Sequence, residues 1–270
     1  GMAIGMTDTI PYTQLLDAAQ ARDGRLHINI PADWAQGRTA YGGLTAALCV
    51  EAAGLVSTEL PPLRSAQFAF IGPAAGQLHA TPTVLRRGKS ATYVGVDLAG
   101  DDGIATRAML CFGATRPSRL TYDALPAPAV PAPEACDEFF RGGMGPAFAV
   151  HFDSRLAGGA RPFSPGEKPE MMLWMRHRDI GARDSVSGLV ALADALPAAA
   201  LVLFPERAPF STATWAVDLL VDAPHSDSGW WLLQSVADSA GNGYSTQAMT
   251  MWNDHGEAVL VARQNVVVFI

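Results

Sequence analysis

Cysteine is scarce in this chain of 270 residues. Only Cys49, Cys111 and Cys136 are present, and an odd number of cysteines without close pairs gives neither a disulfide framework nor a zinc motif. The six histidines are scattered and lack the spacing of metal ligands. We therefore expect no metal, no other cofactor and a reducing compartment, with the cytoplasm as the simplest location.

Basic charge is also low. Lys and Arg number 19 against 26 Asp and Glu, so the formal net charge is −7. Because binding to a phosphate backbone requires a basic surface, we expect no nucleic-acid partner. No run of about 18 apolar residues could span a membrane, and the start of the chain lacks the basic and apolar regions of a signal peptide. A small anionic ligand stays compatible with this composition, since it needs only a local basic patch.

Two widespread catalytic motifs are missing. Gly88-Lys-Ser90 resembles the end of a phosphate-binding P-loop, but Thr83 stands where the first glycine belongs, and a strand is expected to follow. No Gly-x-Ser-x-Gly segment is present either. These gaps disfavour a P-loop nucleotidase and a serine α/β-hydrolase.

The chain does contain a repeated order of predicted elements. Five prolines from Pro117 to Pro133 favour an extended linker, so we predict an N-terminal unit over 1–116, a linker over 117–140 and a C-terminal unit over 141–270. Each unit has an apolar helix followed by four strand-like segments. The helices are expected over 44–56 and 185–196, and the strands over 64–71, 76–86, 90–99 and 104–113, then 212–221, 230–239, 244–252 and 258–269.

This repetition also predicts the fold class. Residues 90–103 match 244–256 to within one position, which indicates an internal duplication. A helix without a wide polar stripe must be buried on most sides, and a curved antiparallel sheet wrapped around it would do so. Two such units could join their sheets edge to edge and protect their edge strands. We therefore predict an α+β double hotdog.

Two short stretches of the first unit have a distinctive pattern: Gly37-Arg-Thr-Ala-Tyr-Gly-Gly43 before the first helix and Val84-Leu-Arg-Arg-Gly-Lys-Ser90 before a long strand. They resemble the aromatic-Gly-Gly entry to the first helix and the turn before a long strand in the acyl-CoA thioesterase II family, and the resemblance extends over nearly the whole chain. In the second unit Asp194, Ala213-Thr214 and Arg263-Gln264 fall where the family has a catalytic Asp, a hydroxyl residue and Gln. The resemblance implies that Asp194, Thr214 and Gln264 are catalytic and that acyl-CoA is the substrate. It also implies a homo-oligomer, a dimer of double hotdogs.

The local settings of two of these residues are unusual. Asp194 lies in an apolar segment at the end of a predicted helix, where the helix dipole disfavours an anion. Gln264 interrupts the most apolar strand, and strand alternation places it inward if Arg263 points outward. A carboxylate, a hydroxyl and an amide that converge could orient a water for attack on a thioester. Thr214 has no such oddity, because threonine is common in strands.

The remaining contacts and alternatives are less specific. The carbonyl of the substrate could be polarised by the helix that starts at Gly42-Gly43 or by the one that starts at Ser185. Arg86 and Lys89 are candidates for coenzyme A phosphates. Met109 is expected at the first-unit position of Gln264, and Glu51 near that of Asp194, so we predict one site per chain.

Two other functions fit the same fold. One is a non-catalytic acyl-thioester binding protein. The other, an enoyl-thioester hydratase, is disfavoured because the second helix has no His. The family often has an Asp-His pair soon after the catalytic hydroxyl, whereas Trp-Ala-Val-Asp218 follows Thr214 here.

Overall fold

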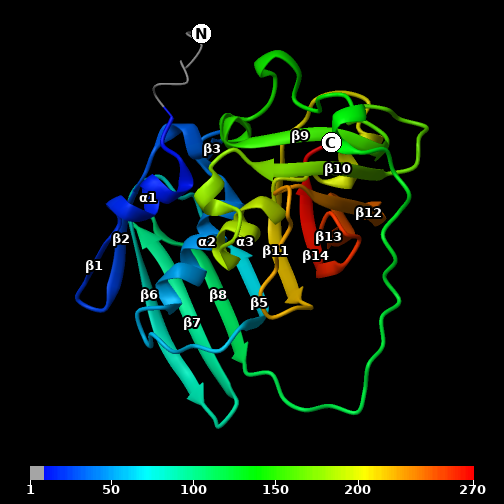
Figure 1. Cartoon of the computed structure of the whole chain (residues 1–270). Coiled ribbons are helices and arrows are strands. Elements are labelled where there is room, and N and C mark those ends of the chain that lie inside the picture. The colour runs from blue at the N-terminus through cyan, green and yellow to red at the C-terminus, as the bar shows by residue number, and fades with distance from the viewer. Residues whose placement is uncertain (1–8) are drawn as a thin grey trace.

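One continuous antiparallel sheet of 12 strands organises the molecule (Figure 1). The computed structural model describes residues 9–270. Its helices are α1 (Tyr12–Ala18), α2 (Gly42–Ala53) and α3 (Val186–Ala193). Its strands are β1 (Gln20–Arg22), β2 (Arg25–Ile30), β3 (Ala35–Gln36), β4 (Thr39–Ala40), β5 (Leu63–Phe70), β6 (Gly76–Arg87), β7 (Ala91–Gly100), β8 (Gly103–Gly113), β9 (Phe152–Gly159), β10 (Glu170–His177), β11 (Phe210–Leu219), β12 (Trp231–Gly241), β13 (Tyr244–Trp252) and β14 (Ala258–Val268).

The strand order is symmetric about the middle of the sheet. It runs β1-β2-β6-β7-β8-β5-β11-β14-β13-β12-β10-β9, while β3 and β4 form a separate pair. Each half thus has the same internal order, and β5 and β11 join the halves through the pairs from Thr214 with Ala69 to Asp218 with Ser65. This order confirms the predicted fold class, because two related units share one sheet without exposing an edge at their junction.

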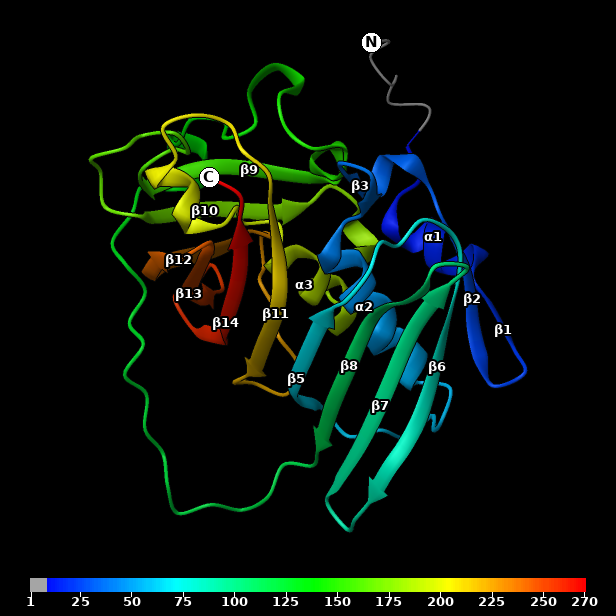
Figure 2. The same cartoon turned by 180° about the vertical axis from the view of Figure 1, so that it is seen from behind.

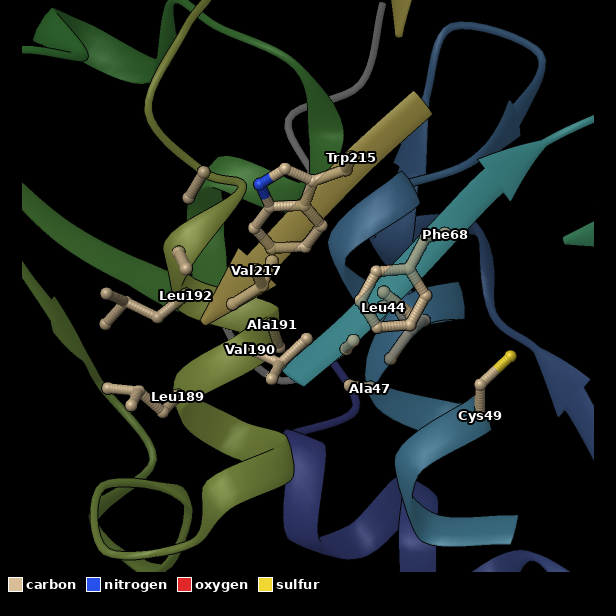
Figure 3. Packing of buried hydrophobic residues seen from close by; sticks show 14 of the residues in the cluster. Leu44, Ala47, Cys49, Phe68, Leu189, Val190, Ala191, Leu192, Trp215 and Val217 are labelled. Carbon is tan, nitrogen blue, oxygen red and sulfur yellow. The ribbon is translucent and has the colours of Figure 1, made fainter. Parts of the chain in front are cut away.

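The two longer helices lie side by side on the inner face of the sheet (Figures 1 and 2). Leu44 and Ala47 of α2 approach Val190 and Ala191 of α3, beneath Trp215 of β11 (Figure 3). Nearly every side chain of both helices is buried, as expected for sequences without a polar stripe. Glycine and alanine residues in both helices let them pack closely, so the start of α2 lies beside the end of α3. No helix in residues 9–270 is long and apolar enough to cross a membrane.

The segment from Ala114 to Ala132 has neither helix nor strand and runs around the outside of the C-terminal half (Figure 1). Two tryptophan side chains bind its backbone. The indole Nε1 of Trp252 donates to the Leu125 carbonyl at 2.8 Å, and that of Trp174 donates to the Pro131 carbonyl at 2.9 Å. These hydrogen bonds hold the segment over the outer face of β10 and β13.

The structure differs from the sequence-based expectations at a few elements. Helix α3 ends at Ala193, so Asp194 is its C-terminal cap instead of a residue in its last turn. The hairpin β1–β2 and the pair β9–β10 were not predicted, and they extend the two ends of the sheet. In β10 the apolar run that begins at Met171 is buried on both faces, so it lacks the alternation that identifies a strand.

Candidate active site

Asp194 lies where the two halves of the molecule meet. As the C-terminal cap of α3 it would face only the negative end of its own helix. However, the first turn of α2 lies beside it, and the backbone N–H of Gly43 donates a hydrogen bond to its carboxyl group. The positive end of α2 therefore offsets the negative end of α3. A carboxylate from the second half caps a helix of the first half.

The Gly42-Gly43 pair permits this close approach. A Cβ atom on Gly42 would lie 3.2 Å from Asp194 Oδ2 and 3.2 Å from Phe70. A Cβ atom on Gly43 would lie 2.5 Å from the Tyr41 hydroxyl and 2.7 Å from the Ala191 carbonyl oxygen, closer than real contacts allow. The Tyr41 hydroxyl itself donates to the Ala191 carbonyl at 2.5 Å. Gly43 is thus required because α2 begins directly against the end of α3, and Gly42 leaves room for the carboxyl group beside it.

A chain of side-chain amides leads to Asp194. The Nε2 of Gln264 donates to Asp194 Oδ1 at 2.5 Å, and the Nε2 of Gln247 donates to Gln264 Oε1 at 2.8 Å. The Oε1 of Gln247 in turn accepts from the Ala199 N–H at 2.7 Å. Gln264 and Gln247 are 4% and 1% exposed, so their amides must find partners inside the protein, and they find each other. Gln264 was predicted at the site from the sequence, whereas Gln247 was not.

The Asp194 carboxyl is a weak acid in this setting. Burial raises its pKa from 3.8 to about 7, against the opposing effects of the hydrogen bonds from Gln264 and Gly43. A pKa near neutrality suits a group that takes a proton and returns it at physiological pH. The neighbouring Tyr41 hydroxyl is held neutral, because burial and the Asp194 charge raise its pKa well above the ordinary value.

Two cavities meet at Asp194. The first, of about 500 Å³, is lined by five phenylalanines, and we call it the aromatic cavity; they are Phe139, Phe140, Phe148, Phe163 and Phe210. The second, of about 420 Å³, is lined by four threonines, and we call it the threonine cavity; they are Thr39, Thr45, Thr106 and Thr212. Both cavities share Asp194, Thr212, Gln36 and Phe210. A ligand that fills both would therefore pass the carboxyl group.

The structure does not bring Thr214 to Asp194. Thr214 is exposed and lines a groove on the outer face of the sheet, whereas Thr212 lines both cavities at Asp194. The reason is a β-bulge at Ala213: Thr212 pairs with the buried Val266, but Thr214 pairs with Asn265. One extra residue reverses the alternation of the strand. The threonine that lines both cavities together with the carboxyl group is thus Thr212, two positions before the predicted residue.

The predicted phosphate contacts also lie elsewhere. Arg86 is on the exposed end of β6 and Lys89 is in the turn after it, and neither lines a cavity at Asp194. Arg161 and Arg207 line the aromatic cavity instead. Arg161 donates to the Phe139 carbonyl at 3.1 Å, and burial lowers its pKa. These arginines come from loops without any motif, so the sequence offered no signal for them.

At the start of α3 and the end of α2, polar side chains form hydrogen bonds with one another. The Ser187 hydroxyl in the first turn of α3 donates to Glu51 at 2.6 Å and accepts from the Tyr12 hydroxyl at 2.7 Å. These groups satisfy one another, and neither cavity at Asp194 includes them. Of the two helix starts considered for the substrate carbonyl, only that of α2 lies at the Asp194 site.

The first half has no amide at the counterpart of Gln264. Met109, the expected match, is 40% exposed on the outer face. In the second half Gln264 pairs with Trp215, and in the first half Ala108 pairs with Phe68. Trp215 and Phe68 pair with each other across the junction, so Ala108 is the counterpart of Gln264. The buried Ala108 thus holds the inward position, and alanine cannot orient a water.

Comparison with known proteins identifies the family. A model of the acyl-CoA thioesterase C-terminal domain matches residues 125–268, and one of the N-terminal domain matches residues 30–113. The chain therefore belongs to the acyl-CoA thioesterase family, as the sequence resemblance predicted. No curated protein matches the sequence.

Solved structures share the fold. A hotdog-fold protein of unknown function from Alicyclobacillus acidocaldarius is 22% identical, with a TM-score of 0.85 over 95% of this chain and 97% of its own. A putative thioesterase II from Thermobifida fusca is 19% identical, with a TM-score of 0.80 and full coverage of both chains. An acyl-CoA thioesterase II from Mycobacterium marinum is 17% identical, with a TM-score of 0.74 over 94% of this chain and 96% of its own. At such identities the likeness concerns the fold.

Proposed function

We propose that this protein hydrolyses acyl-CoA thioesters to a free acid and coenzyme A at one site per chain, centred on Asp194. The observation that carries the proposal is a carboxyl group with a pKa of about 7 at the junction of two cavities, held by Gln264 and by the first turn of α2. Thioester hydrolysis needs a base, side chains that orient a water and a donor to the carbonyl oxygen, and this junction has residues for each of these roles.

In the proposed reaction Asp194 acts as the general base. Its ionised form takes a proton from a water, and the water oxygen attacks the thioester carbonyl carbon. The first turn of α2 stabilises the oxyanion that forms on the carbonyl oxygen, with the Gly42 N–H as the donor, because the Gly43 N–H binds Asp194 and the next two N–H groups bind the Tyr41 carbonyl. Collapse of this intermediate breaks the C–S bond, and the sulfur leaves as a thiolate that accepts the proton from Asp194. Gln264 orients the carboxyl group, and Thr212 contributes a hydroxyl to the water.

The cavities suggest how the substrate lies. We assign the acyl group to the aromatic cavity, because its phenylalanine side chains offer an apolar surface. The pantetheine arm, which has polar amides, then lies in the threonine cavity, where hydroxyl groups can bind it. Cytoplasmic location and pairing of two chains stay predictions from the sequence.

The experiment that tests this function is release of free thiol from acyl-CoAs of short to long chain length. We expect turnover of at least one of them and a loss of about 10²–10⁴-fold in kcat for Asp194→Asn, the usual contribution of a general base. Asp218→Asn is the matched control, since Asp218 is exposed on the same sheet, outside the site. If acyl-CoAs bind without any release of thiol, the chain is an acyl-thioester binding protein and the proposal is wrong.

A further inference from the structure

A second buried glutamine lies behind the proposed site. Gln247 of β13 pairs directly with Gln264 of β14 in the sheet, and only 1% of its surface is exposed. It does not line either cavity at Asp194, so it cannot touch a substrate bound there. Its two hydrogen bonds nevertheless connect the backbone of a third segment to the site.

The direction of these hydrogen bonds follows from the backbone. The N–H of Ala199, in the short 3₁₀ helix Ala199–Leu203, can only donate, so the carbonyl end of Gln247 must face it. The NH₂ end of Gln247 must then face Gln264, which accepts through Oε1. Gln264 has only its NH₂ end left for Asp194. One backbone donor thus determines the orientation of two amides, each of which could otherwise adopt either of two orientations.

We propose that Gln247 is a positioning residue that, together with the Ala199 N–H, keeps the NH₂ group of Gln264 turned toward Asp194. This inference rests on the proposed thioesterase function for its catalytic consequence only. Without Gln247 the Gln264 amide is free to turn its Oε1 toward the carboxylate, where two oxygens repel each other. All three hydrogen bonds point the same way, and each polarises the next in a buried setting.

The consequence concerns the proton on Asp194. The hydrogen bond from Gln264 lowers the pKa of Asp194, so its loss raises that pKa above about 7. The other titratable or charged groups at the site are Tyr41 at the start of α2 and Arg161 and Arg207 in the aromatic cavity. The hydrogen-bond partners of Gln247 are Ala199 and Gln264, so its substitution removes no hydrogen bond of these groups.

The test uses Gln247→Leu and Gln247→Glu in the full chain. Leu removes both hydrogen bonds at similar size. The Glu carboxylate still accepts from Ala199 but also demands a donor from Gln264, so it draws the NH₂ group away from Asp194. We expect the rising limb of the kcat/KM pH profile to move by about one pH unit or more to higher pH in both variants. A shift of one unit lowers kcat/KM about tenfold below pH 7. KM changes little, because Gln247 does not line the cavities.

Gln234→Leu is the matched control. Gln234 lies in the adjacent strand β12, is partly buried and donates to Glu170 at 2.7 Å, away from the site. Its loss is expected to lower the melting temperature as a Gln247 variant does but to leave the pH profile unchanged. If the Gln247 variants only lower the melting temperature and the pH profile stays in place, Gln247 is merely structural and the inference is wrong.

A second readout does not depend on activity. The carboxyl stretch of Asp194 can be followed by infrared difference spectroscopy against Asp194→Asn, which reports its titration directly. We expect the Asp194 midpoint to rise in both Gln247 variants and to stay unchanged in Gln234→Leu. Absence of thiol release in the wild type would refute the proposed function, whereas an unchanged infrared midpoint would refute the role of Gln247.

Discussion

Burial of the Asp194 carboxyl makes the stability of the fold depend on pH. Its pKa is about 7 in the folded protein and 3.8 when it is free in water. Between these two values the folded protein keeps a proton that the unfolded chain releases. The stabilising contribution is therefore complete below pH 3.8 and is lost as the pH rises through 7. A carboxyl group with a lowered pKa would show the opposite slope.

Asp194→Asn removes this dependence, because an amide does not ionise while its Oδ1 can still accept from Gln264. From pH 5 to pH 7 the wild type loses about 1.36 kcal/mol per pH unit, and the loss stops above the folded pKa. We expect the stability of the variant relative to the wild type to rise by about 2–3 kcal/mol between pH 5 and pH 8. In a chain of this size that corresponds to about 4–12 °C in melting temperature.

Urea unfolding at both pH values measures the change, and the comparison of two pH values cancels any constant cost of the substitution. Asp218→Asn serves as the control, because it makes the same substitution at an exposed position of the sheet. If the difference between Asp194→Asn and the wild type is the same at both pH values, the pKa of Asp194 is not raised in the folded protein and its proposed role as a base loses its basis.

Two further predictions concern the neighbours of Asp194. Thr212→Val should lower kcat about tenfold, the effect of one lost hydrogen bond. Thr214→Val should leave kcat unchanged. A larger loss of kcat in Thr214→Val than in Thr212→Val would refute the assignment made from the β-bulge. Gly43→Ala should destabilise the fold by about 1–3 kcal/mol in urea unfolding, because its Cβ atom meets Tyr41 and Ala191. Gly241→Ala is the control, since a Cβ atom there has no neighbour within 4 Å, and equal effects of the two substitutions would contradict the close helix contact.

Local patterns were sufficient to predict most of the elements. Alternating apolar residues and turn residues placed β6, β7, β8 and β13 to within a residue or two, because one face of each strand is buried and the other is not. The pair β9–β10 was not predicted, because β10 is buried on both faces and buried and exposed residues alternate little along β9. The duplication predicted two related units with joined sheets, and the symmetric strand order agrees with two copies of one plan.

The site was predicted only in part. Asp194 and Gln264 stood out because a carboxyl group and an amide in apolar segments need partners, and they are each other's partners. Gln247 has the same property, but it lies in a strand with several polar residues, where it is not conspicuous. Thr214 was predicted for the site, whereas the structure brings Thr212 to the cavities at Asp194, because a β-bulge depends on the pairing of two strands and leaves no mark in the residues themselves.

The order of apolar and polar residues along the chain is therefore enough to determine the hotdog halves and the two most unusual residues of the site. Periodicity along a strand or helix is a local property that a single sequence carries. The environment of Asp194 is not local: the start of α2 comes from the other half, Ala199 from a 3₁₀ helix and Gln247 from a strand about fifty residues further on. Only the packing of α2 against α3 under the shared sheet brings these groups together and raises the pKa of the carboxyl group to about 7.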